Sequence, residues 1–89
     1  MITAIILLKV KQDKVNEVAS KLAAIDGVRE AYSVAGKYDI TAIVWVKNTE
    51  QLSDLVTEKI LKVDGILESE TQLAFRAYSK YDLDRTFSL

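Results

Sequence analysis

The sequence contains no cysteine, no histidine and no proline, and these absences exclude several kinds of site and argue against an internal linker. Without cysteine the chain forms no disulfide, no thiolate nucleophile and no sulfur-ligated metal site. Without histidine it lacks the commonest nitrogen ligand for metals and the usual general base at neutral pH. With only three glycines and no proline, no segment is typical of a linker. We therefore expect one domain that needs no cofactor.

The sequence also lacks the concentrated positive charge that binds polyanions. Twelve basic and thirteen acidic residues give a net charge of -1, and no stripe of lysine and arginine follows any segment. Direct binding to nucleic acid or to an anionic membrane is therefore not expected. The apolar run 2–8 lacks a basic leader and ends at Lys9, far short of a membrane span, so we expect a cytoplasmic protein.

One short phrase occurs twice in the chain, Asp-Gly-Val at 26–28 and Asp-Gly-Ile at 64–66. Each copy closes a segment with helical periodicity and opens one with strand periodicity, so the chain reads as two strand–helix–strand halves. Two such halves in one small α+β domain predict a βαββαβ, ferredoxin-like sandwich, in which two helices cover one face of a four-stranded antiparallel sheet.

The alternation of apolar and polar residues gives the expected bounds. Strands are predicted at 2–10, 28–35, 40–47 and 66–78. One helix is predicted from about 13 to the glycine at 27. A second follows a capping box formed by Asn48 and Gln51 and ends before the glycine at 65. The folded domain is thus expected to span 1–78, and the aperiodic tail 79–89 is interpreted as a short helix or an arm on a neighbouring subunit.

The first and third predicted strands are apolar on both faces, although helices can cover only one of them. In this topology both strands are central, so the second face would meet water unless another sheet packs on it. That face carries either Ile5, Leu7, Ile43 and Trp45 or the opposite set. A dimer that forms through the sheet is therefore expected, and a monomer with an exposed apolar sheet is the alternative.

A set of short motifs in the second half has a recognisable order and spacing. Gly36-x-Tyr38-Asp39 precedes the apolar third strand, and the second Asp-Gly phrase is followed by Ser69-x-Thr71 and the apolar residues 73–75. Over about 2–75 the chain resembles the effector domain of the Lrp/AsnC transcription regulators, called RAM (regulation of amino acid metabolism). The helix-turn-helix that usually precedes this domain does not appear in the sequence, so the resemblance indicates a stand-alone RAM domain.

The resemblance implies a sensor of amino acids that has no catalytic activity and modulates transcription through assembly. In such domains dimers form through the sheets, assemble into rings and bind a free amino acid between dimers. The corresponding ligand-binding residues here are a turn of one subunit and two strand residues of another, namely Gly36, Lys37, Tyr38 and Asp39 with Ser69 and Thr71. A DNA-binding Lrp/AsnC paralogue is a further possible partner. Backbone N–H groups at Gly36 suit a carboxylate, and Asp39 suits an ammonium group.

Each of these residues also has a purely structural interpretation. Gly36 can simply supply a turn, Asp39 can hydrogen-bond its own loop, and Tyr38 can pack at a subunit interface. Ser69 and Thr71 can be a polar stretch of one sheet face, and Glu68 with Glu70 can be solvated charges or a carboxylate pair on the other. The alternative function is a dimeric α+β-barrel enzyme, such as a cofactor-free oxygenase or isomerase, which would require an apolar cavity inside each subunit. A third is an assembly scaffold with an empty pocket.

Overall fold

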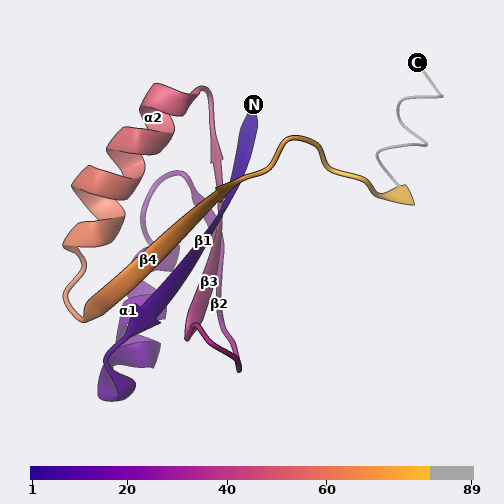
Figure 1. Ribbon diagram of the computed structural model, residues 1–89. Helices are drawn as coiled ribbons and strands as arrows, with labels where there is room; N and C mark the ends of the chain where they lie inside the picture. Colours follow the sequence, from indigo (N-terminus) through magenta and orange to yellow (C-terminus); the bar gives the residue numbers. More distant parts are fainter. Residues whose placement is uncertain (81–89) are drawn as a thin grey trace.

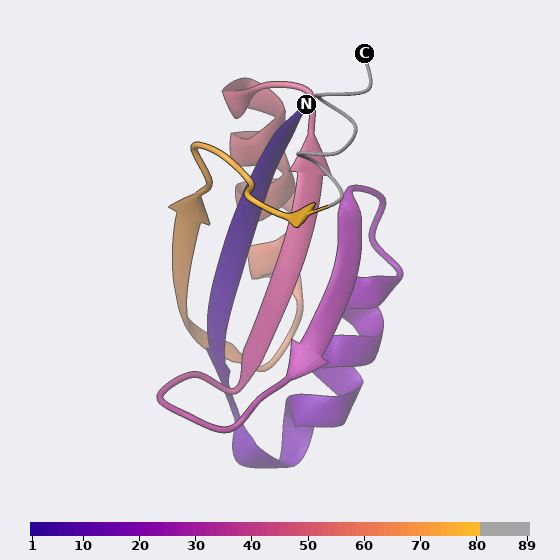
Figure 2. The same cartoon turned by 90° about the vertical axis from the view of Figure 1, so that its right-hand side faces the viewer.

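The computed structural model describes residues 1–80 and shows the predicted βαββαβ order (Figure 1). The strands and α-helices are β1 (Ile2–Val10), α1 (Val15–Ala23), β2 (Val28–Ser33), β3 (Ile40–Val46), α2 (Thr49–Asp54) and β4 (Ile66–Leu73). All strand pairs are antiparallel, and the order β2-β3-β1-β4 makes β1 and β3 central, as predicted. Figure 2 looks at the sheet from the side that the helices leave uncovered. The ferredoxin-like α+β fold is confirmed.

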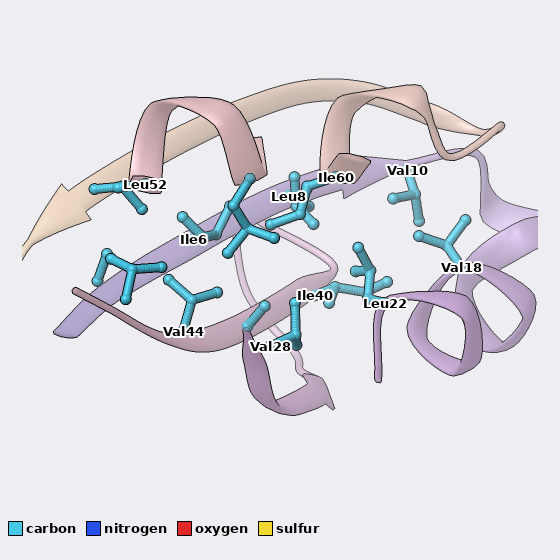
Figure 3. Close-up of a cluster of buried hydrophobic side chains, with 14 residues drawn as sticks. Ile6, Leu8, Val10, Val18, Leu22, Val28, Ile40, Val44, Leu52 and Ile60 are labelled. Carbon is cyan, nitrogen blue, oxygen red and sulfur yellow. The ribbon is translucent and has the colours of Figure 1, made fainter. Parts of the chain in front are cut away.

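The core lies between the sheet and the helices. Successive residues of a strand point to opposite faces, so every second residue of β1 and β3 faces the helices and is excluded from water. The buried strand residues are Ala4, Ile6, Leu8, Val10, Val28, Ile40, Ala42, Val44 and Val46, and the helical segments add Val18, Leu22, Leu52, Leu55 and Ile60. Figure 3 shows these aliphatic side chains converging from both layers.

The second helical segment begins as the sequence predicts, with one difference at its cap. The Asn48 side chain accepts a hydrogen bond from the Gln51 backbone N–H at 2.8 Å, which is one half of a capping box. The Gln51 side chain accepts from the Lys47 N–H at 2.6 Å instead of from Asn48. The cap therefore fixes the backbone one residue further back, at the end of β3.

Both helical segments contain irregular turns. A 3-10 turn, η1 (Gln12–Lys14), precedes α1, and α2 continues as a π-helical stretch, η2 (Leu55–Lys59), and a 3-10 turn, η3 (Ile60–Lys62). The predicted helices are therefore present over nearly their expected lengths, but regular α-helix forms only their middle or first part.

Two strands end earlier than predicted. β2 ends at Ser33 rather than 35: Ser33 pairs with Ile40, and the next cross-strand bond, from the Val34 N–H to the Asp39 carbonyl at 2.9 Å, closes the turn. β4 ends at Leu73 rather than 78, because Leu73 pairs with Ala4 and the Ala74 N–H bonds the Thr3 carbonyl at 3.0 Å. Beyond that point β1 has almost no residues left to pair with. Most of the tail 79–89 lies outside the described residues, so its predicted role stays a prediction.

Burial of Leu22 predicts a clear stability difference between two leucines. Leu22 is fully buried, whereas Leu61 is 41% exposed. Leu22→Ala should lower the free energy of unfolding by about 2–5 kcal/mol through lost burial and a residual cavity. Leu61→Ala, the matched control, should change it by less than about 1 kcal/mol. Urea unfolding at one fixed protein concentration measures both, and equal losses for the two variants would contradict the assignment of the core.

Candidate effector site and the open sheet face

The face of the sheet away from the helices, here the open face, has an apolar centre. The register pairs Ile5 with Ile43 and Leu7 with Thr41, which places these side chains on that face. Trp45 is 43% exposed there, and Ile5, Leu7 and Ile43 are half-buried. The sequence left open which of the two apolar sets is uncovered. The helices cover the opposite set, and Ile5, Leu7, Ile43 and Trp45 lie on the open face. Such a contiguous apolar surface is typical of an interaction site.

Charged and polar groups of β2 border this centre. The Arg29 guanidinium lies 3.7 Å from the centroid of the Trp45 ring, a cation–π contact. The Tyr32 hydroxyl donates a hydrogen bond to the Glu30 carboxylate, and this bond raises the pKa of the Tyr32 phenol. At the β2 margin of the open face, the Arg29 guanidinium and the Glu30 carboxylate are therefore each held by a neighbouring aromatic side chain.

Asp39 is held by three hydrogen bonds to other parts of the chain. Its N–H donates to the Leu8 carbonyl and its carbonyl accepts from the Val34 N–H, both at 2.9 Å. Its carboxylate Oδ2 accepts from the Val10 N–H at 2.9 Å. One carboxylate oxygen thus caps the end of β1, where the β1–β4 register shifts between Lys9 and Val10. A ligand's ammonium group would have to share this carboxylate with that backbone bond.

Of the other turn residues, Gly36 and Lys37 are exposed, and Tyr38 is partly buried like Asp39. Gly36 has φ 147° and would have no atom within 4 Å of an added Cβ, so its backbone faces open space. The Lys37 carbonyl accepts from the Lys9 ammonium at 3.3 Å. The Tyr38 hydroxyl makes a long hydrogen bond of 3.4 Å to Glu70. The turn is therefore positioned by its two ends, while Gly36 leaves backbone groups free to meet a ligand.

Ser69 and Thr71 lie on the other face of the sheet from Glu70. Thr71 pairs with Ile6 and Ser69 with Leu8, so both hydroxyls point to the helix side, although β4 is an edge strand and both are exposed. Thr71 lines a groove of about 260 Å³ beside α2, with Thr49, Leu52, Ser53, Val56 and Thr57.

Within one chain the turn 36–39 therefore meets Glu70 rather than Ser69 or Thr71. Glu70 also accepts from the Gln72 amide at 3.0 Å. From the sequence, Glu70 is expected to be a solvated charge or one of a carboxylate pair. From the sequence, strand alternation indicates that Glu70 and Ser69 lie on opposite faces. The pairing of β4 with β1 is needed in addition to place Glu70 beside Tyr38. The expected site joins two subunits, so its six residues stay a prediction.

Two further observations concern residues 1–80 only. No group of three acidic side chains among them is placed to hold a metal ion. No helix in the same range is long and apolar enough to cross a membrane.

The bond between Asp39 and Val10 predicts different effects for two substitutions. Asp39→Ala leaves a partly buried N–H without its acceptor and should lower the free energy of unfolding by about 1–3 kcal/mol. Asp39→Asn retains an acceptor oxygen and should recover most of that loss. Chemical denaturation of both variants beside wild type measures the difference. If Asp39→Ala is as stable as wild type, the carboxylate does not hold the end of β1.

Comparison with known proteins places this arrangement in a family. A family model described as the Lrp/AsnC ligand binding domain matches residues 3–83. The HTH-type transcriptional regulator LrpA of Pyrococcus abyssi is 41% identical over 56 residues, which are 63% of this chain and 40% of LrpA. The chain spans about half the length of the curated relatives it matches.

Solved structures have the same fold. TTHA0845 from Thermus thermophilus superposes with a TM-score of 0.84 and 42% identity, over 90% of this chain and 100% of that one. A feast or famine regulatory protein from M. tuberculosis, solved with L-methionine, superposes with a TM-score of 0.75 over 90% of this chain and 54% of its own. Its identity is 21%, so it supports the fold alone. The family match covers both halves of the sandwich, and the chain belongs to the Lrp/AsnC ligand-binding domain family.

Proposed function

We propose that this domain binds a free α-amino acid and that binding changes its assembly into larger oligomers. The observation that carries the proposal is the family match over residues 3–83, which includes the turn, β4 and both central strands. In this proposal the domain is a cytoplasmic sensor without catalytic activity that does not bind DNA itself. It acts on transcription through its own assembly or through a DNA-binding Lrp/AsnC paralogue.

The open face supports the first step of assembly, a dimer that forms through the sheet. Two copies that pack face to face would bury Ile5, Leu7, Ile43 and Trp45, which one copy leaves in contact with water. A standard interface buries about 1,600 Å² of total surface from the two partners, so we expect the flanking β2 and β4 residues to contribute as well. The apolar centre and polar margins match the usual anatomy of an interface.

The second step places the amino acid between dimers. The turn offers exposed backbone at Gly36, and β4 offers the exposed hydroxyls of Ser69 and Thr71 on its helix side. These two surfaces diverge within one chain, which is the arrangement needed if the turn of one subunit meets β4 of another in a ring. The turn supplies backbone N–H donors and the Asp39 carboxylate, and the β4 hydroxyls can donate or accept, so the two surfaces together can bind both ends of a zwitterion.

A regulatory role agrees with the electrostatics better than the alternative of an enzyme. Lys14 and Glu17 form an exposed ion pair at 3.3 Å, which raises the pKa of the lysine and lowers that of the carboxylate. Such surface pairs shift pKa values without forming a reactive cleft. The interior position where an enzyme of this fold would hold its substrate is filled by aliphatic side chains (Figure 3).

The dimer predicts a sharp difference between two charged substitutions. Ile43→Asp puts a carboxylate into the centre of the open face and should convert the dimer into monomer or unfold it. Leu61→Asp puts the same charge at a 41% exposed position on the helix side and should leave the dimer intact. Sedimentation velocity at micromolar concentration reports both. Wild-type protein that sediments as a single chain across that range would contradict the sheet dimer.

Amino-acid binding is tested by thermal shift and calorimetry with each of the twenty amino acids. Loss of one hydrogen bond to a charged ligand group costs about 1.5–3 kcal/mol, so Ser69→Ala, Thr71→Val or Asp39→Asn should weaken binding at least about tenfold. At a free concentration about 100 times the dissociation constant, the effector should stabilise the assembly by about 2.7 kcal/mol.

Ser20→Ala is the matched control, because Ser20 is an exposed hydroxyl on α1 away from the turn and β4. It should bind as wild type does. If no amino acid at millimolar concentration changes melting or assembly, the proposed function is wrong. If an amino acid binds and none of the three variants weakens it, the function stands and the site is wrong.

A further inference from the structure

The chain does not end with the sheet. After β4, residues 74–80, here the arm, leave the edge of the sheet and extend on the side of the open face, away from both helices (Figure 1). Figure 2 shows the same segment passing in front of the sheet, at the end where β1 begins and β4 ends. The two views together place the arm in the space that a partner on the open face would adjoin.

Two aromatic side chains of the arm have almost no contact with their own chain. Phe75 is 95% exposed and Tyr78 is 80% exposed. An aromatic side chain buries roughly 150–250 Å² when it packs, so both retain nearly all of their potential apolar contact surface. The arm cannot bury these rings by extending β4 along β1, because Leu73 already pairs with Ala4 near the start of β1.

We propose that the arm packs on a second copy of this chain, the copy that covers the open face, and so completes the dimer interface. The inference rests on the sheet dimer of the proposed function and adds a separate contact to it. Under two-fold symmetry the contact occurs twice, each arm on the opposite subunit. Phe75 and Tyr78 are its apolar anchors, in keeping with the prominence of aromatic residues at interfaces.

Charge favours the same occupant. The arm carries Arg76 and Lys80 and no acidic residue. At the β2 margin of the open face Glu30 lies 4.0 Å from Arg29, and at the β4 margin Glu68 and Glu70 lie on the same face, with Lys9 opposite Glu68. The two β4 carboxylates, Glu68 and Glu70, are the acidic part of this border, and the basic arm of a second copy packed on the open face would lie near them. Opposite charges at an interface orient the partners and speed their encounter.

The first test removes the two anchors. The double variant Phe75→Ala/Tyr78→Ala should raise the dimer dissociation constant at least about tenfold, because truncating aromatic anchors at an interface carries a cost of that size or larger. Leu61→Ala is the control, since it truncates an exposed apolar side chain on the helix side and should leave the constant unchanged. Sedimentation equilibrium or dilution fluorescence anisotropy gives the constants.

Comparison with Ile43→Asp separates the two proposals. If Ile43→Asp dissociates the dimer and the arm variant dimerises as tightly as wild type, the arm proposal is wrong and the sheet dimer stands. If neither substitution weakens the dimer, both are wrong.

The second test does not depend on how the variants fold. A dimer mixed from isotope-labelled and unlabelled wild-type chains allows isotope-filtered nuclear Overhauser spectra, which detect only contacts between subunits. We expect cross-peaks between the Phe75 or Tyr78 ring and the other subunit. A formed dimer in which neither ring gives a cross-peak to the other subunit would overturn the proposal and leave the arm to another partner.

Discussion

The fold leaves two strands with more apolar surface than its own helices can cover. β1 and β3 lie at the centre of the sheet and carry aliphatic side chains on both faces, while α1 and α2 pack on one. The covered face is dry at Ile6, Leu8 and Val44, and the open face leaves Trp45 partly in water. Hydrophobic burial is the main favourable contribution to folding and association alike, so the same strand pattern that builds the core also favours a partner.

The pairing of β4 with β1 places alternate β4 residues on opposite faces of the sheet. Because Glu70 pairs with Leu7 and Thr71 pairs with Ile6, adjacent residues serve opposite sides of the molecule. Glu70 joins Tyr38 at the margin of the open face, and Thr71 faces the groove beside α2. Residues that are neighbours in sequence can therefore contribute to two different subunit contacts. In the proposed assembly Thr71 belongs to the site between dimers, and Glu70 borders the interface within the dimer.

Much of the fold could be predicted from the sequence because its determinants are local. The repeated Asp-Gly phrase and the change from strand to helix periodicity located every strand, and the cap at Asn48 was recognisable. The early end of β4 was not predictable in this way, because the alternating pattern continues through residues 73–78. The pairing stops because β1 has almost no residues before Ala4, the partner of Leu73. The π-helical stretch η2 has no local signal that we can identify.

The candidate site was less predictable than the fold for a related reason. The turn could be located from Gly36 and Asp39, yet the Asp39 carboxylate bonds Val10, which is distant in sequence and becomes a neighbour only through the sheet. Likewise, the proximity of Tyr38 and Glu70 depends on the β1–β4 register. Sequence pattern gives residue types and faces, whereas contacts between faces require the assembled sheet.

The most direct measurement is a crystal structure of the protein purified from cell extract without added ligand. The account predicts that open faces pair across a two-fold axis, and that density shaped like an amino acid lies where Gly36 to Asp39 of one subunit meet Ser69 and Thr71 of another. Open faces exposed to solvent throughout the crystal, or ligand density on a different surface, would contradict it.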